Sequence, residues 1–517
     1  MPSAFVTLVW AAIIGDVVIL LQYRRGDGYV AFITRMRQTN CFRAPMYPHS
    51  GFWGGSDLFE QRQKATRNGN MQALYTRHFA ALGKTWQEKF WNQRIINTMD
   101  SENHQYIHSL GFGDFSKPNQ RMKISAPILG NGIFVAEGAH WKSSRGIIKP
   151  IFARAELENM AMMVKHVNRF IKLLPRNSKA FDIQPLLKRM NLDISTEFLF
   201  GESVDAQTPE GAPIADKFSW SLEASLTGWH KRRSVGLLSV RYYFDKSWAE
   251  AYNDLYRFID SHVYRALNLT SPSAISEEAS HSVGDTSRYI LLYEMAKEIR
   301  DPISLRFELI NVFLPSRDTT GALLSNMFFQ LARHPKYWYE LRQTALSLPF
   351  DASDPSALTC SALKSLLPFR YVIQETLRTI GPVGRVFREA RKDTTLPRGG
   401  GPDGTSPVFV GKGTIVYSLP YHIHHDKDIW GDDADGFRPE RWAEGTRKGW
   451  QFVPFLGGPR ICPAQQQVML QATYVLLRVV LEFEWIENRD EVHEYVELQR
   501  MAIESRRGVQ ISGVGGT

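Results

Sequence analysis

The stretch Phe455-Leu-Gly-Gly-Pro-Arg-Ile-Cys-Pro-Ala464 holds the residues with the clearest chemistry in this sequence. Its glycines and proline predict a tight loop that keeps side chains away from a flat ligand. Cys462 lies beside the start of a predicted helix, where backbone N–H groups and the helix dipole favour a thiolate. Arg460 can reach an anionic group on the same ligand. A thiolate against an apolar-faced planar macrocycle is a haem axial ligand, so Cys462 is the predicted iron ligand.

The alternative interpretation of Cys462 is a small core cysteine beside a glycine turn. Against this, the whole stretch closely resembles the haem-binding loop of the cytochromes P450, the haem-thiolate monooxygenases, with Ala464 where most members have glycine. The resemblance implies that the cofactor is heme b (iron protoporphyrin IX), and that Phe455, Arg460 and Cys462 bind it.

Two further patterns resemble the residues of this family that hold the haem propionates. Trp141-Lys-Ser-Ser-Arg145 is similar to the W-x-x-x-R motif of the helix that borders the haem, and residues four apart share a helix face. Taken alone, such a pair is usually a surface pair. Arg388 falls where the family places another propionate-binding arginine, although Arg385 competes for that place. The resemblance implies that Trp141, Arg145, Arg388 and Arg460 hold the propionates.

The segment Pro315-Ser-Arg-Asp-Thr-Thr320 lies midway along a predicted long helix. It resembles the family's A/G-G-x-D-T-T segment, in which an acid and an alcohol deliver protons during oxygen activation. The resemblance implies that Asp318 and Thr319 are the catalytic pair, because a carboxylate beside a hydroxyl can relay protons from water. Pro315-Ser316 replaces the usual small pair, so we expect a groove of different shape. The alternative is a solvated Asp-Thr-Thr on a helix surface.

A structural motif supports the same family. Glu375-Thr-Leu-Arg378 resembles its E-x-x-R signature, and Phe437-Arg-Pro-Glu-Arg441-Trp442 lies between that signature and Cys462. The resemblance implies a buried ionic triad of Glu375, Arg378 and Arg441, which fixes geometry more than it adds net stability.

The elements that position these residues are mostly helices. Apolar periodicity predicts helices over 156–174, 184–200, 246–267 and 302–333, and a late helix from Pro463 to Leu481. Asp301 and Pro302 suit the start of the long helix, His334-Pro335 its end, and Pro315 inside it should remove one hydrogen bond and kink it. From about 382 to 420, β-branched runs broken by Gly399–Gly401 predict strands. The predicted fold class is mainly α with a minor β portion, which is the fold that the family resemblance implies.

The first 25 residues form a separate segment. Ala4–Leu21 is nearly continuously apolar and is followed by Arg24 and Arg25, which predicts an N-terminal transmembrane anchor with the remaining chain in the cytosol. Asp16 within the run is unfavourable at that depth, and a buried core helix is the alternative. The predicted organisation is an anchor (1–25), a linker (26–55) and a single large haem domain (56–517).

Composition excludes several other classes of protein. The chain has 517 residues, of which 43% are hydrophobic and 22% charged, so it is neither disordered nor fibrous. Its three cysteines form no CxxC motif, which argues against a disulfide scaffold or a cysteine-built zinc site. The net charge of +9 contains no run of five or six like charges, so nucleic acid is a poor candidate partner.

The sequence therefore predicts a membrane-anchored monooxygenase of the endoplasmic reticulum that inserts one oxygen atom of O2 into an apolar substrate. Family resemblance implies that electrons come from NADPH through NADPH-cytochrome P450 reductase. Thr395–Gly404 resembles the fungal branch that hydroxylates alkanes and fatty acids; a secondary-metabolite intermediate is the rival substrate. Two other functions stay open: a haem-thiolate isomerase, dehydratase or peroxide-using enzyme, and a non-catalytic haem-binding membrane protein.

Overall fold

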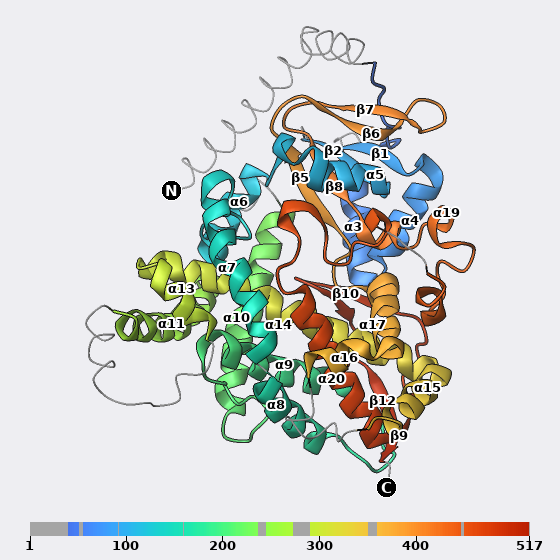
Figure 1. The fold of residues 1–517 in the computed structure, drawn as a ribbon. Coiled ribbons are helices and arrows are strands. Elements are labelled where there is room, and N and C mark those ends of the chain that lie inside the picture. Colours follow the sequence, from blue (N-terminus) through green and yellow to red (C-terminus); the bar gives the residue numbers. More distant parts are fainter. Residues whose placement is uncertain are drawn as a thin grey trace. The chain divides into compact units, whose positions relative to one another are not determined.

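The computed structural model describes residues 40–50, 55–90, 93–158, 160–235, 245–271, 290–349, 359–445 and 449–515. The predicted anchor lies outside these ranges. Within them, no helix is both long enough and apolar enough to cross a membrane. The described chain is mostly helical with small sheets, as predicted, and it divides into two compact units (Figure 1).

Unit 1 comprises the described residues within 40–57, 77–116 and 387–418 and carries most of the described strands. Its five-stranded sheet has the order β1-β2-β8-β5-β3, in which β1 pairs with β2 antiparallel and β2 with β8 parallel. A separate β6–β7 hairpin turns at the glycines predicted to break the strands; Gly399 and Gly401 have φ of 114° and 75°. The elements are β1 (Thr85–Phe90), β2 (Gln93–Thr98), α5 (Ser101–Gln105), the π-helix η1 (Tyr106–Leu110), the 3-10 helix η2 (Phe112–Asp114), β3 (Phe115–Ser116), β5 (Val386–Ala390), β6 (Thr394–Gly400), β7 (Ser406–Val410) and β8 (Ile415–Ser418).

Part of the predicted linker is paired with this unit. The backbone N–H of Phe42 donates to the carbonyl of Pro407 at 2.8 Å, and that of Tyr47 donates to Gln87 at 2.8 Å. Residues 40–50 therefore extend the β-structure of unit 1, a role that a turn-rich composition did not indicate.

Unit 2 comprises residues 58–76, 117–386 and 419–517, and it carries most of the predicted site. Its helices are α6 (Asn119–Leu129), α7 (Gly138–Glu158), α8 (Met160–Leu173), α9 (Ile183–Phe200), α10 (Ala212–Val235), α11 (Lys246–Leu269), α13 (Leu291–Glu298), α14 (Pro302–Arg333), α15 (Pro335–Leu346), α16 (Cys360–Ser365), α17 (Leu367–Ile380), α18 (Pro420–Ile423), α19 (Lys427–Trp430) and α20 (Gln465–Glu482), with 3-10 turns η4 (Pro439–Trp442), η5 (Gly449–Gln451) and η6 (Gly458–Arg460). Its short strands are β4 (Phe181–Asp182), β9 (Phe483–Asn488), β10 (Glu497–Gln499), β11 (Ile503–Ser505) and β12 (Gln510–Gly515). Two further helices, α3 (Ser56–Asn68) and α4 (Met71–Leu82), each contain one of the points where the chain passes from one unit to the other.

Helix α14 has the boundaries that the sequence predicts. The Asp301 carboxylate caps it by accepting the Ser304 N–H at 2.7 Å, and Pro302 occupies the first turn, where a missing N–H costs nothing. The helix ends at Arg333, and Pro335 begins α15. Helical backbone continues through Pro315, so this proline does not end the helix.

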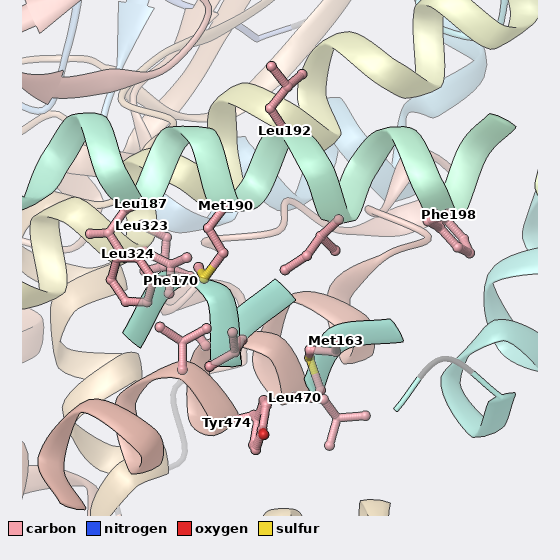
Figure 2. Close-up of a cluster of buried hydrophobic side chains, with 14 of the residues drawn as sticks. Met163, Phe170, Leu187, Met190, Leu192, Phe198, Leu323, Leu324, Leu470 and Tyr474 are labelled. Atoms are coloured by element: carbon pink, nitrogen blue, oxygen red, sulfur yellow. The ribbon is translucent and has the colours of Figure 1, made fainter. Parts of the chain in front are cut away.

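The core of unit 2 forms where α8, α9, α14 and α20 pack together. In Figure 2, Met190 of α9 points toward Phe170 of α8 and toward Leu323 and Leu324 of α14. Tyr474 of α20 belongs to the same buried cluster. Truncating one of these buried leucines to alanine typically costs about 2–5 kcal/mol, so this packing fixes α14 firmly.

Two predicted helix starts differ from the structure. The residues expected to form one helix over 156–174 belong to the end of α7, which already starts at Gly138, and to α8. The late helix begins at Gln465 rather than Pro463, because Ala464 occupies its N-cap position.

Candidate active site

The Cys462 loop is a tight turn that leads into α20. The N–H of Cys462 donates to the Phe455 carbonyl at 3.1 Å, which closes the loop. Leu456 and Gly458 have left-handed backbones, with φ of 61° and 66°. At Gly457 a Cβ atom would lie 2.4 Å from the Trp450 ring. The loop therefore requires small residues, as predicted.

The protonation of Cys462 differs from the sequence expectation. Burial raises the pKa of its thiol, and this effect outweighs the Ala464 N–H and the charge of Arg145, which both lower it. The helix terminus was expected to favour the thiolate, but α20 starts three residues after Cys462 and contributes little. The surroundings alone thus favour the thiol, and a bound cation is what would stabilise the thiolate.

Arg460 and Trp141 lie together, as the family resemblance implies. The Arg460 guanidinium lies over the Trp141 ring, 4.5 Å from its centroid. It also donates to the Ala136 carbonyl at 2.7 Å and pairs with the Glu137 carboxylate at 3.0 Å. Burial lowers the pKa of Arg460, although this side chain stays charged at any relevant pH.

Arg145 provides the test of whether an anionic cofactor fits here. Its guanidinium is half-buried and interacts electrostatically with Cys462, yet it forms neither a hydrogen bond nor an ion pair with any residue that the structure describes. A half-buried cation without an anion is costly. A planar ligand that carries carboxylates and binds iron through Cys462 would satisfy both groups, so the residues fit a haem.

Arg388 lies on β5 in unit 1 and is buried, with 4% of its surface exposed. It donates to the Phe387 carbonyl at 2.8 Å. Burial, followed by the charge of Arg388, lowers the pKa of the neighbouring His104 to about 3. Its competitor Arg385 donates to the Tyr75 hydroxyl at 2.6 Å. Arg388 is thus a buried cation beside a neutral histidine, and its role toward a propionate stays a prediction.

Asp318 and Thr319 lie midway along α14, as predicted. The Thr319 hydroxyl donates to the Pro315 carbonyl at 2.8 Å. Asp318 accepts from the Arg317 guanidinium at 3.1 Å, and burial raises the pKa of its carboxyl group even though Arg317 lowers it. Thr319 is half-buried, so the acid and the alcohol do not form a fully solvated surface pair.

Asp318 also lines a charged cleft with about 520 Å³ of empty space, part of it open to solvent. Ion pairs link the other walls: Arg317 and Arg500 contact Glu223 of α10 at 3.5 and 3.1 Å, and Lys188 contacts Glu504 at 2.6 Å. Water in this cleft can reach the carboxyl group of Asp318.

The predicted ionic triad is present. The Arg378 guanidinium donates twice to the Glu375 carboxylate, at 3.0 and 2.8 Å, and Arg441 donates to it at 2.9 Å. Glu375 and Arg378 are fully buried. The Trp442 indole N–H and the Arg438 backbone N–H also donate to this carboxylate, at 3.0 and 2.9 Å.

Sequence reasoning missed a second set of polar residues on α14. Glu308 and Asn311 are buried and bind the backbone of the segment that precedes α7, and Asn191 of α9 donates to the Ser316 and Arg317 carbonyls at 3.1 and 2.7 Å. Asn311 and Glu308 lie about one and two helical turns before Pro315 in an otherwise apolar run, which was an available signal.

Comparison with known proteins agrees with this arrangement. Residues 57–508 match the family described as Cytochrome P450. The chain is 34% identical to cytochrome P450 monooxygenase apdE of Emericella nidulans, over 94% of this chain and 91% of that protein. It is 33% identical to cytochrome P450 52A12 of Debaryomyces hansenii, with 96% of both chains covered, and 37% identical to cytochrome P450 52A6 of Candida tropicalis, with 77% of both covered.

A mainly helical chain with a cysteine loop before a core helix and a half-buried arginine, Arg145, near the cysteine belongs to the haem-thiolate class. The chain is a member of the cytochrome P450 family, and it is an oxygen-incorporating oxidoreductase that uses haem. The isomerase and non-catalytic alternatives have no support among these relatives.

Proposed function

We infer that this enzyme inserts one oxygen atom of O2 into a long apolar substrate and releases the other atom as water. The reaction consumes two protons and two electrons. NADPH supplies the two electrons through a reductase. A haem held by Cys462 supplies the oxygen-activating chemistry. The observation that carries the proposal is the placement of Asp318, a half-buried carboxyl group that reaches a solvent-open cleft from the middle of α14.

Cys462 is the proposed iron ligand, and the Phe455 side chain packs beside the loop. Arg145 and Arg460 neutralise the propionates, Trp141 supports Arg460 through its ring face, and Arg388 is the further propionate residue. Because Arg145 and Arg460 are half-buried, each guanidinium–carboxylate contact is stronger than it would be on the surface.

Asp318 and Thr319 form the proposed proton path. The Asp318 carboxyl group takes a proton from cleft water, and the raised pKa keeps a larger protonated fraction near neutral pH. The Thr319 hydroxyl, held by the Pro315 carbonyl, passes the proton onward or orients the water that does. Arg317 keeps the carboxylate from turning away.

The experiment compares Thr319→Ala with Thr320→Ala, a neighbouring buried threonine. Neither change touches Cys462 or the arginines, so both variants should bind haem and be reduced normally. Thr319→Ala should uncouple the enzyme, so that NADPH is consumed and peroxide replaces most of the product, whereas Thr320→Ala should stay coupled. Removal of one proton-transfer group costs roughly 10²–10⁴-fold in rate.

Full coupling in the Thr319→Ala protein would show that the relay assignment is wrong. The ligand assignment has a separate test, because Cys462→Ser should abolish the thiolate-type absorption band of the reduced, CO-bound protein. A retained band would mean that another cysteine ligates the iron.

The proposed substrate class is alkanes and fatty acids, and the proposed location is the membrane of the endoplasmic reticulum with residues 1–25 as a single-pass anchor. The likeness of Thr395–Gly404 to the fungal hydroxylase branch and the apolar N-terminal segment support these proposals. A panel of alkanes, fatty acids and polycyclic compounds, screened for substrate-induced Soret shifts, tests the class. A shift with polycyclic compounds alone would refute it.

A further inference from the structure

Residues 130–137, which connect α6 to α7, form a short segment that we call the strap. It is bound on one side by α14 and on the other by Arg460. Its own turn is closed by the N–H groups of Val135 and Ala136, which both donate to the Gly132 carbonyl at 2.9 Å.

Two buried side chains of α14 hold the strap through its backbone. The Glu308 carboxylate accepts the Ile133 N–H at 2.9 Å, and the Asn311 amide oxygen accepts the Phe134 N–H at 2.9 Å. The Asn311 NH2 group donates to the Leu129 carbonyl at 2.8 Å. Glu308 also accepts the hydroxyl of Ser144 in α7.

The fit between the strap and α14 leaves no room for larger residues. A Cβ atom at Gly132 would lie 2.4 Å from the Asn311 amide nitrogen. At Gly130, which has φ of 51°, a Cβ atom would lie 2.1 Å from the Phe307 ring. The strap therefore has one position along α14.

The other side of the strap provides most of the surroundings of Arg460. Its guanidinium donates to the Ala136 carbonyl at 2.7 Å and to the Ile133 carbonyl at 3.5 Å. The Glu137 carboxylate, 3.0 Å from Arg460, also accepts the Lys117 N–H at 2.9 Å. Ile133 thus donates to Glu308 and accepts from Arg460 within one residue.

We propose that Glu308 and Asn311 are positioning residues for Arg460, acting through the strap, so that α14 sets the orientation of a guanidinium two residues from the iron ligand. The proposal rests on the proposed role of Arg460 toward a haem propionate. On this proposal α14 has a second role besides proton delivery. Polar contacts in its first half determine how tightly the cofactor is bound on the cysteine side.

The test measures haem dissociation from the purified holoenzyme into excess apomyoglobin, together with the reduction potential. Asn311→Ala removes the strap contact to the Phe134 N–H and the neighbouring contact to the Leu129 carbonyl. Its matched control is Asn326→Ala, because Asn326 is a buried asparagine of the same helix that donates to the Ile380 carbonyl at 2.7 Å and accepts the Tyr495 hydroxyl at 2.8 Å. Loss of a residue that orients a ligand typically costs about 10–100-fold in cofactor affinity, so Asn311→Ala should speed haem loss about tenfold or more and shift the potential. The control should lose stability without either change.

A double-mutant cycle with Arg460→Met separates this inference from the proposed function. If the strap acts through Arg460, Asn311→Ala should change haem loss less than about twofold in the Arg460→Met background, because the two effects are not independent. Equal effects of Asn311→Ala in both backgrounds, or equal effects of Asn311→Ala and Asn326→Ala, would overturn the inference. If Arg460→Met itself leaves haem binding unchanged, the propionate role of Arg460 is wrong instead.

Gly132→Ala and Glu308→Gln keep the test informative if Asn311→Ala does not fold. Gly132→Ala pushes the strap away from Asn311 and leaves every side chain of α14 in place, so it should also speed haem loss. Glu308→Gln keeps an acceptor for Ile133 and should have a smaller effect. If Glu308→Gln sped haem loss more than Gly132→Ala, the result would contradict the geometry.

Discussion

Replacing Asp318 by asparagine should slow the enzyme and at the same time stabilise it. Burial raises the pKa of this carboxyl group above its usual value near 3.8, against the opposing charge of Arg317. A group with a raised pKa binds its proton more tightly in the folded state than in the unfolded state. Its ionisation therefore costs folding free energy at every pH above the raised pKa, and asparagine avoids this cost because it cannot ionise.

The size of the effect follows from the linkage between pKa and stability. Each unit by which folding raises the pKa costs about 1.4 kcal/mol once the group is ionised. An unfolding entropy of roughly 2 cal/mol/K per residue means that this cost moves the melting temperature of a chain of this length by only about 1–2 °C. The gain of Asp318→Asn should be largest near pH 8 and should vanish as the pH falls toward the ordinary carboxyl value.

Scanning calorimetry of the holoenzyme between pH 5 and pH 8 measures this difference, and Asp490→Asn is a control of opposite sign. Burial of Asp490 favours its neutral form, but the Arg507 guanidinium, at 2.8 Å, and the Val492 N–H, at 3.0 Å, outweigh burial and lower the pKa. Asp490→Asn should therefore destabilise the protein at neutral pH, and this loss should disappear only as the pH falls through the lowered pKa.

The same Asp318→Asn protein should produce much less product per unit time, because the carboxyl group that carries protons inward is gone. A variant that is less stable than the parent at pH 8 would refute the raised pKa of Asp318. A stability difference that does not change with pH would refute it as well. A more stable variant with normal turnover would leave the burial argument intact and remove Asp318 from the proton path.

Two other substitutions test the frame around the haem site. Glu375→Gln leaves two buried arginines poorly paired and should cost about 3–5 kcal/mol, seen as low holoenzyme yield and early urea unfolding. Glu440→Gln, at an exposed ion pair, should cost less than about 1 kcal/mol. Similar losses of stability in the two variants would contradict the structural role of Glu375. Charge reversal at the exposed residues Lys142 and Lys149 of α7 should slow reduction by the reductase at low salt, with Lys412→Glu as the control. An unchanged reduction rate would place the docking face elsewhere.

Helix α14 was the most predictable element, because its signals are local. A capping aspartate, a first-turn proline and a terminal His-Pro each act on adjacent backbone groups, so Asp301 and Pro335 locate the two ends without tertiary information. The β-pairing of residues 40–50 carries no such local signal, because its partners, Gln87 and Val408, lie far along the chain.

The site was predictable where a short motif carried it. Cys462, Trp141 and Arg460 come together as the resemblance implied, but the effect of burial on the thiol pKa could not be read from the helix start. A helix start is a sequence feature, whereas the burial that outweighs it depends on the whole fold. The strap contacts of Glu308 and Asn311 join segments far apart in the chain, so no motif could reveal them.

The two halves of α14 have different roles, and this difference explains how a buried helix with polar side chains stays stable. Its first half carries Glu308 and Asn311, Asp318 lies at its middle, and a buried polar group left without a partner costs about 1–3 kcal/mol. The strap satisfies Glu308 and Asn311, whereas Arg317 offsets only part of the burial cost of Asp318. The second half, with Leu324 and Phe328 in the core, supplies packing worth several kcal/mol and holds the helix in place. Substitutions there should lower stability without altering the proton path, whereas polar changes in the first half should alter function first.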